Sequence, residues 1–294
     1  MAVVGTNSSG KSALGIELAR RVGGEVVSAD SRQVYRGLDL GTGKVTSAEM
    51  AGVPHHLLDV VDPGEPFSLA AYQRLAYAAI DALVERAVTP LLVGGSGLYA
   101  RAVVEGYQLV DAEPDPARRA ELQSWNDERL LAELERLDPT AAEQLDLPNR
   151  RRLVRAVEIA EAGHVRADTR RRQPRYRTLL LGLTWPRPVL DERIATRLRA
   201  RMDAGLVAEV EGLLAAGVEA DFLEGLGLEY RFTIRYLRGE YASEDELFEH
   251  ANRAVCRFAR RQLSWFRRDE EIVWLDCDGD YVEQAAGLVE RFLR

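Results

Sequence analysis

The chain has 294 residues, of which 46% are hydrophobic and 29% charged, and it carries a formal net charge of −8. This length and composition are typical of a globular protein with one large domain, or with a core domain and a smaller inserted one. No run of about 18 apolar residues is present, which excludes a membrane-spanning helix.

The N-terminal residues lack a basic segment and a long apolar run, so we expect no signal peptide, a cytoplasmic location and no membrane partner. Cys256 and Cys277 stand alone, without a Cys-x-x-Cys pair. We therefore expect two free thiols in a reducing compartment and no protein zinc site. The sequence indicates no protein partner.

Short apolar runs alternate with helical patterns in the first third of the chain. The apolar runs predict buried strands at residues 3–4, 25–29, 57–61 and 91–93. Helical spacing predicts helices between them at residues 11–22 and 68–86. This alternation implies a parallel, doubly wound sheet. Later apolar runs predict additional strands at residues 178–183 and 272–275.

The character of the sequence changes between Asp111 and about Arg177. Residues 111–116 are acidic and rich in proline, as in a linker. Residues 118–137 and 148–162 are charged and show helical patterns, and no segment between them resembles a strand.

These patterns predict an α/β fold: a P-loop-type parallel sheet flanked by helices, with an inserted all-helical subdomain. We expect residues 1–110 and 178–294 to form the core domain and residues 111–177 to form the inserted helical subdomain. From Asp191 onward the core domain is expected to be mostly helical.

Residues 5–12 match the phosphate-loop pattern G-x-x-x-x-G-K-[ST]. Glycines let the backbone wrap around a phosphate, and the N-terminus of the following helix points at the anion. Lys11 adds a positive charge, and the Ser12 hydroxyl is placed to bind Mg²⁺. The pattern predicts a diphosphate or triphosphate with Mg²⁺ and does not specify ATP. The candidate phosphate-binding residues are Gly5, Thr6, Asn7, Ser8, Ser9, Gly10, Lys11 and Ser12.

The residues that follow the predicted strands differ from those of a motor-type NTPase. Such a protein has a strand that ends in an Mg²⁺-binding aspartate, whereas residues 91–93 are followed by Gly94-Gly95-Ser96-Gly97. The strand at residues 25–29 does end in an aspartate, Asp30, with Ser31-Arg32-Gln33 directly after it. A strand-end aspartate often only caps a helix, so Asp30 alone does not establish a catalytic group.

Several segments together resemble the motifs of the tRNA dimethylallyltransferase (isopentenyltransferase) family. Besides the phosphate loop they are Asp30–Tyr35, Gly41–Lys44, Gly52–Leu57, Gly94–Tyr99, Asn149–Glu158, Asp191–Glu209 and Phe258–Arg268. They follow the family's order over nearly the whole chain. No C-terminal zinc finger follows them, so we expect the bacterial type.

The resemblance implies that a dimethylallyl group moves from dimethylallyl diphosphate to the exocyclic N6 amine of the adenosine beside the anticodon of tRNA. Lys11, Ser12 and Mg²⁺ would neutralise the leaving diphosphate. The aspartate that matches Asp30 would accept the proton of the amine. The implied partner is the tRNA anticodon stem-loop, whose adenosine leaves its stack to react.

The resemblance also assigns individual residues. Ser96 stands where the family usually has threonine, so a hydroxyl is kept. The segment with Arg193 and Arg197 brings an arginine to the diphosphate in the family, and the spacing does not say which of the two. The implied catalytic residues are Asp30, Lys11, Ser96, Arg193 and Arg197. The implied tRNA-contacting residues are Asp30, Ser31, Arg32, Gln33, Ser96, Arg118, Arg151, Arg152 and Arg155.

The basic residues are unevenly distributed for an acidic chain. Residues 150–177 hold ten arginines against three acidic residues, and residues 252–268 hold six arginines and no acidic residue. These stretches fit a groove that contacts phosphates, or they are only solvated helix faces. Trp265 and Phe266 likewise fit either the core or a platform for a base.

Three other functions remain open. A prenyltransferase acting on free adenine nucleotides would share the phosphate loop and the aspartate, but it would not need the basic inserted region. A P-loop small-molecule kinase would hold ATP, and the sequence offers no clear second Mg²⁺-binding carboxylate. A non-catalytic RNA-binding protein with this fold would not need to retain Lys11, Ser12 and Asp30.

Overall fold

The computed structural model describes residues 1–109, 115–144, 149–164 and 172–294. They form two compact units, each with its own apolar core. The first unit consists of Met1–Ala100 and Arg177–Arg294, and the second of Arg101–Tyr176. No helix among the described residues is long and apolar enough to cross a membrane.

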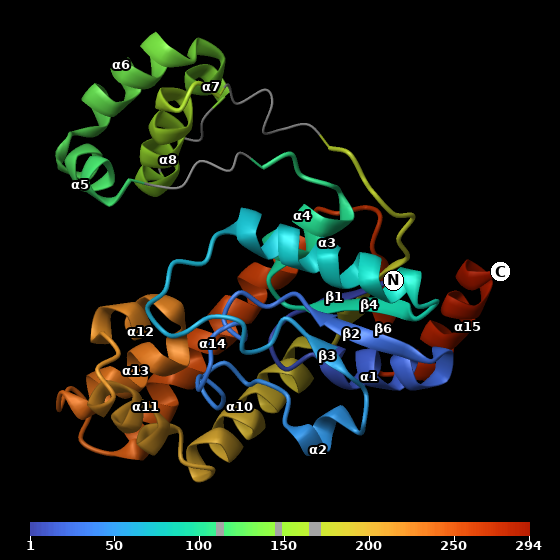
Figure 1. The fold of residues 1–294 in the computed structure, drawn as a ribbon. Helices are drawn as coiled ribbons and strands as arrows, with labels where there is room; N and C mark the ends of the chain where they lie inside the picture. Colours follow the sequence, from blue (N-terminus) through green and yellow to red (C-terminus); the bar gives the residue numbers. More distant parts are fainter. Residues whose placement is uncertain (110–114, 145–148, 165–171) are drawn as a thin grey trace. The chain divides into compact units, whose positions relative to one another are not determined.

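The first unit is built on a six-stranded, entirely parallel sheet (Figure 1). In spatial order its strands are β3 (His55–His56), β2 (Gly24–Ser28), β4 (Thr89–Gly94), β1 (Ala2–Gly5), β5 (Leu180–Thr184) and β6 (Val273–Asp276). In the centre of the sheet Val3 lies beside Val93 on one side and Leu181 on the other. Because all strands run in the same direction, their carboxyl ends meet at one edge, where ligands bind in such sheets.

Helices cover both faces of this sheet. They are α1 (Lys11–Val22), α3 (Leu69–Glu85), α4 (Gly97–Val104), which continues into the second unit, and α15 (Tyr281–Leu293). Helices α1 and α15 lie on one side of the sheet and α3 on the other (Figure 1). Leu18 of α1 and Ala285 of α15 are fully buried against Leu181 of the sheet. Burying such apolar side chains supplies most of the driving force for this layered packing.

A second apolar cluster of the first unit joins a group of helices to the loop after β2. The helices are α10 (Arg187–Asp203), α11 (Leu206–Ala215), α12 (Ala220–Leu226), α13 (Leu228–Leu237) and α14 (Glu244–Phe266), and the loop also carries the short α2 (Ser47–Met50). Val34 and Leu38 of the loop pack with Leu198, Leu223 and Tyr230 of the helices. This packing holds the segment that follows Asp30 against the helical layer.

The second unit is helical in its described part. Its helices are α5 (Pro116–Ser124), α6 (Asp127–Leu137), α7 (Pro139–Gln144) and α8 (Arg150–Glu161). Leu122, Leu130, Leu134 and Leu153 are almost completely buried in its core. The only β-type contact among its described residues is an isolated bridge between Tyr107 and Arg172.

The α/β fold predicted from the sequence is confirmed, and so are the predicted strands near residues 3, 26, 92, 181 and 274. The strand predicted at residues 57–61 is wrong. The strand there is the two-residue β3, and the backbone turns immediately after it, with φ values of 63° at Leu57 and 55° at Asp59. Such left-handed conformations cannot continue an extended strand, so the apolar residues of this run pack as part of a loop.

The helical pattern predicted at residues 118–137 is confirmed, and the structure divides it into two helices. Helix α5 ends at Ser124, and Trp125 has an extended backbone with φ −74° and ψ 153°. The Asn126 side chain then accepts a hydrogen bond from the Arg129 backbone N–H and starts α6. An N-cap asparagine in a run of helix formers marks such a break. The helix predicted at residues 148–162 is confirmed as α8, apart from Pro148, which lies outside the described residues.

Candidate active site

The phosphate-loop motif joins the carboxyl end of β1 to the start of α1. Two residues of the loop have positive φ angles, 59° at Ser8 and 95° at Gly10. Glycine adopts the left-handed conformation without strain, which explains the need for it at position 10. No side chain caps the N-terminus of α1. The exposed backbone N–H groups and the helix dipole therefore favour an anion at this point.

A cavity of about 640 Å³ opens beside this loop. Ser8, Lys11 and Ser12 contribute to its lining from the loop and α1, and Arg193 and Arg197 line it from α10. Arg193 donates from Nε to the Ser8 carbonyl at 3.0 Å, whereas Arg197 donates to the Gly43 carbonyl at 3.3 Å. The structure thus brings both candidate arginines into one cavity and places Arg193 directly on the phosphate loop.

Lys11 is half-buried and lines this cavity. Its ammonium donates to the Thr6 carbonyl at 3.2 Å. Burial lowers the pKa of Lys11 to about 8, while the negative charge of Asp30 raises it and the charge of Arg197 lowers it. Burial also lowers the pKa of Arg197. Positive charges held together in a dry site bind an anion strongly, because an anion relieves their mutual repulsion.

A second cavity, of about 610 Å³, lies at the carboxyl ends of β2 and β4. Asn7 lines this cavity and its neighbour Ser8 lines the first, so the phosphate loop has one face toward each. Asp30, at the end of β2, and Ser96, at the end of β4, both line the second cavity. Gly94 must be glycine for these ends to approach, since a Cβ atom there would lie 2.0 Å from the Ala29 carbonyl oxygen.

Hydrogen bonds join the residues predicted to contact the adenosine. The Ser96 hydroxyl accepts from the Ser31 backbone N–H at 3.0 Å and lies 3.2 Å from the Ser31 hydroxyl. The Gln33 side chain donates to the Gly43 carbonyl at 3.2 Å, the same oxygen that Arg197 contacts. Residues from β2, β4 and α10 are therefore tied into one rigid wall, which is what a site needs to orient a reactant.

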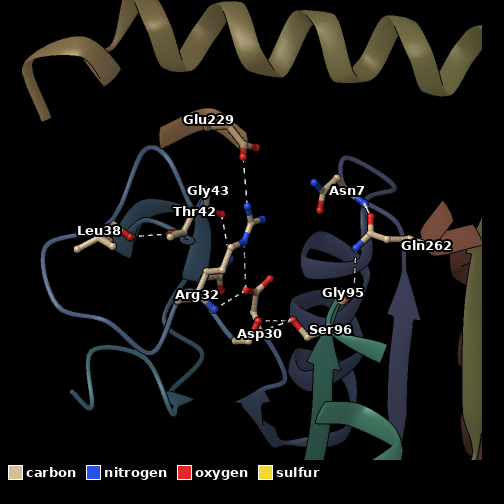
Figure 2. Close-up of polar contacts among 12 residues, drawn as sticks. Asn7, Asp30, Arg32, Leu38, Thr42, Gly43, Gly95, Ser96, Glu229 and Gln262 are labelled. Atoms are coloured by element: carbon tan, nitrogen blue, oxygen red, sulfur yellow. Dashed lines mark hydrogen bonds and ion pairs between the residues drawn. The ribbon is translucent and has the colours of Figure 1, made fainter. Parts of the chain in front are cut away.

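The carboxylate of Asp30 is largely buried and has one engaged oxygen. Its Oδ1 accepts from the Arg32 backbone N–H at 3.0 Å and lies 3.8 Å from the Arg32 Nε (Figure 2). The guanidinium of Arg32 also contacts Glu229 of α13 at 3.2 Å, and Glu229 contacts Arg201 of α10 at 3.3 Å. The pKa of Arg32 is raised: burial alone would lower it, but the charges of Glu229 and Asp30 outweigh that effect.

Gln262 of α14 is a site residue that the sequence did not reveal. Its side-chain oxygen accepts from the Asn7 backbone N–H at 3.0 Å, and its side-chain nitrogen donates to the Gly95 carbonyl at 3.0 Å (Figure 2). It therefore ties the phosphate loop to the loop after β4. Its place in the resemblance segment Phe258–Arg268 was the only available signal, since a glutamine on a charged helix looks like a surface residue.

The junction between α12 and α13, residues 225–231, borders the second cavity. In the structure this segment joins α12 to α13, and Gly225, Leu226, Gly227, Leu228, Glu229 and Arg231 line the second cavity. Trp265 lines the same cavity and is half-buried, whereas Phe266, which also contributes to the lining, is 2% exposed and belongs to the core. The two aromatic residues predicted as a pair thus have different surroundings.

The other predicted tRNA contacts lie in the second unit. Arg119, Arg150, Arg151 and Arg155 line a cavity of about 760 Å³ between α5 and α8. Arg155 is paired with Glu158, and Arg118 with Glu121 and Glu161. Arg151 and Arg152 are exposed and have no ion pair among the described residues. The strongly basic stretch is therefore partly neutralised within the unit.

The residues described include no cluster of three or more His, Cys, Asp or Glu side chains that could hold a metal ion. Ser12 remains the predicted ligand, and this residue lines the first cavity. One hydroxyl fits Mg²⁺, because this ion commonly takes one or two protein ligands together with phosphate oxygens and water. The donor set thus suits a Mg²⁺ ion that arrives with a diphosphate.

Comparison with known proteins identifies consistent relatives. The family model described as IPP transferase matches residues 33–269. A tRNA dimethylallyltransferase 2 of Shewanella sediminis is 45% identical over 287 residues, which cover 96% of this chain and 95% of the relative. A tRNA dimethylallyltransferase of Salinispora arenicola is 45% identical over 298 residues, which cover 100% of this chain and 85% of the relative.

Solved structures show the same fold. The tRNA isopentenylpyrophosphate transferase of Bacillus halodurans aligns with a TM-score of 0.73 and 37% identity, over 99% of this chain and 94% of the other. A eukaryotic dimethylallyltransferase acting on tRNA aligns with a TM-score of 0.85 over 99% of this chain and 78% of the other. At 22% identity the latter similarity demonstrates the shared fold alone.

Proposed function

This chain belongs to the IPP transferase family, and we propose that it transfers a dimethylallyl group from dimethylallyl diphosphate to the N6 amine of the adenosine beside the anticodon of tRNA. Diphosphate is the second product. The observation that carries this proposal is the pair of cavities that share the phosphate loop, one with Lys11 and Arg193 at the start of α1 and the other with the carboxylate of Asp30 beside Ser96. Relatives of nearly equal length, 45% identical, bear the name of this activity.

The first cavity, at the start of α1, fits the diphosphate of the prenyl donor. We propose that the diphosphate lies against the phosphate loop and the N-terminus of α1, with Lys11 and Arg193 as its charged contacts. Arg193 is favoured over Arg197 because it already contacts the loop through Ser8. Ser12 would hold Mg²⁺, which would supply further positive charge to the diphosphate. These groups stabilise the charge that develops on the diphosphate as the allylic C–O bond breaks.

The second cavity, which contains the carboxylate of Asp30, fits the acceptor adenine. The amine nitrogen forms a bond to the allylic carbon, the C–O bond breaks with its electrons on the diphosphate, and the amine loses a proton. We assign Asp30 as the base that takes this proton, a role worth about 10²–10⁴-fold in rate. Ser96 fixes the Asp30–Ser31 turn through its two contacts with Ser31. Arg32 and Gln33 complete the wall against which the base is read.

The second unit is proposed to hold the rest of the tRNA. Its cavity between α5 and α8 is lined by four arginines, and guanidinium groups bind phosphates well. The contacts assigned to this unit are Arg118, Arg151, Arg152 and Arg155. The exposed and unpaired pair, Arg151 and Arg152, offers the most freely available charge.

The test is transfer of labelled dimethylallyl from its diphosphate, in the presence of Mg²⁺, to unmodified tRNA and to AMP in parallel reactions. We expect label in tRNA and none in AMP. Label in AMP alone would establish a transferase for free nucleotides instead. Label in neither, together with phosphate transfer from ATP to a small molecule, would establish a kinase.

A further inference from the structure

The Arg32 guanidinium lies between two buried carboxylates. Its Nη1 is 3.2 Å from Glu229 Oε2, whereas its Nε is 3.8 Å from Asp30 Oδ1 (Figure 2). The side chain of Glu229 is only 3% exposed and that of Arg32 15%. Glu229 uses its other oxygen for Arg201, at 3.3 Å. Arg32 is therefore bound to the distant glutamate more closely than to the aspartate two residues before it.

The two oxygens of Asp30 differ in their surroundings. Oδ1 accepts from the Arg32 backbone N–H at 3.0 Å and is the oxygen nearest the guanidinium. Oδ2 accepts no hydrogen bond from any residue that the structure describes. A carboxylate that acts as a base needs such a free oxygen within reach of the proton it accepts.

We propose that Glu229 is a positioning residue that keeps Arg32 from pairing fully with Asp30 and so leaves Oδ2 free to take the proton from the adenine amine. This inference rests on the proposed role of Asp30 as the base. An arginine prefers a bidentate contact with a carboxylate, in which two parallel N–H groups bind both oxygens. The single long contact at 3.8 Å departs from that geometry because Glu229 holds the guanidinium from the other side.

The charges around the cluster make this restraint necessary. Arg32 is buried, and a buried charge without a partner is strongly unfavourable. Among its described contacts only Glu229 and Asp30 carry negative charge. If Glu229 lost its charge, the guanidinium would turn to Asp30 and occupy the oxygen that the reaction needs. Glu229 is therefore expected to act on the chemical step through Arg32.

This mechanism predicts a suppressor relationship. Glu229→Gln should lower the rate of the chemical step roughly 10²-fold, which is part of the full contribution of a general base. Arg32→Gln added to Glu229→Gln should restore much of that rate, because the competing guanidinium is gone. Glu229→Asp, which keeps the negative charge, should remain within about tenfold of the unaltered protein. A purely structural role for Glu229 predicts the opposite, since a second buried change would add to the damage.

The experiment measures single-turnover transfer of dimethylallyl to tRNA, with both substrates saturating, in the whole chain. A control is Glu283→Gln, which removes the charge of a surface glutamate that pairs with Arg21 and lies outside the lining of both cavities. That control should leave the saturated rate unchanged. Thermal unfolding of every variant checks that it is folded, and Glu229→Asp carries the test if Glu229→Gln does not fold.

The expected result is a slow Glu229→Gln protein that Arg32→Gln accelerates. A double variant as slow as Glu229→Gln, or slower, would overturn the inference, and so would a Glu229→Gln protein with a normal rate. If Glu229→Asp is the only variant that folds, a rate lowered by more than about 10²-fold in that variant would overturn it. Asp30→Asn in the same assay separates failure of the proposed base from failure of the role proposed for Glu229. If Asp30→Asn stays fast, the base assignment itself fails; if it is slow and no suppression occurs, only the role of Glu229 fails.

Discussion

Two regions of the molecule use the same arrangement, a buried glutamate between two arginines. In the first unit Glu229, with a side chain 3% exposed, binds Arg32 and Arg201, which are 15% and 16% exposed. In the second unit Glu158, 7% exposed, binds Arg119 and Arg155, which are 38% and 33% exposed. The contacts are shorter in the second unit, 2.7 and 3.0 Å against 3.2 and 3.3 Å.

The difference lies in what surrounds each arrangement. In the first unit Arg32 is largely buried beside another carboxylate, Asp30, so the glutamate determines which carboxylate this arginine engages. The arginines of the second unit are partly exposed and line a cavity toward which other arginines also project. There the glutamate holds two guanidinium groups in place at the edge of that cavity. With the roles proposed above, the same residue types would protect a base in one unit and orient phosphate contacts in the other.

The largest effect is expected from removing the carboxylate that distinguishes the first unit. Asp30→Asn keeps the size and the contact with the Arg32 backbone but cannot take a proton. We expect kcat to fall by about 10²–10⁴-fold, while tRNA binding stays nearly unchanged. Single-turnover rates and a direct tRNA-binding assay measure the two quantities. If Asp30→Asn has a near-normal kcat, Asp30 is not the base, and Glu229 then has no base to protect that would distinguish it from Glu158.

The next effect concerns stability. Glu229→Gln leaves two buried arginines without their shared partner, and breaking a buried pair in this way costs about 3–5 kcal/mol. Glu158→Gln should lower the free energy of unfolding by less, about 1–2 kcal/mol. The two arginines that bind Glu158 are about one third exposed, so water screens their charges. Urea unfolding, followed separately in each unit by hydrogen exchange, measures both.

The control for these two variants is Glu283→Gln. Glu283 is 62% exposed and pairs with Arg21 at the surface, so its loss should change the unfolding free energy very little. Equal costs for Glu229→Gln and Glu158→Gln would mean that burial of the arginines does not separate the two regions.

The sequence predicted the architecture because the sheet is built from uninterrupted apolar runs between helical patterns. It failed where backbone conformation overrides composition. The apolar run after His56 reads as a strand, but positive φ angles at Leu57 and Asp59 turn it into a loop. Asn126 interrupts a helical pattern whose charge and periodicity continue on both sides of it. Both features depend on single residues, which a periodic pattern averages out.

The candidate site was predictable to the extent that its residues follow strands or lie in the phosphate loop. Asp30, Ser96 and Lys11 do so, and the structure brings them to adjacent cavities. Glu229 lies 197 residues after its partner Arg32, and Gln262 lies 255 residues after its partner Asn7, so no local pattern connects them to the site. Their partners depend on how the helical layer packs against the loop after β2, which is a tertiary property.

A smaller effect distinguishes arginines within the second unit. Arg151 has no ion pair among the described residues, whereas Arg118 is bound to Glu121 and Glu161. Arg151→Ala should therefore weaken tRNA binding more than Arg118→Ala and lower the slope of log affinity against log salt by about 1. Binding titrations at several salt concentrations measure this. The reverse order would show that the glutamates release Arg118 when tRNA binds.

The smallest effect concerns Lys11, the cation of the first unit whose charge changes near neutral pH. Burial lowers its pKa to about 8, so it is charged below that pH and loses its proton above it. The affinity for dimethylallyl diphosphate should therefore fall as pH rises through 8, by at most about tenfold per pH unit. Titrations between pH 7.5 and 9.5, without tRNA, measure this, since the diphosphate itself is fully ionised over that range.

Lys11→Arg is the matched control, because a guanidinium stays charged over this range. The affinity of this variant for the diphosphate should therefore not vary with pH. An unaltered protein with constant affinity would mean that the diphosphate is held by Arg193 and the backbone of the loop, with no essential charge at position 11.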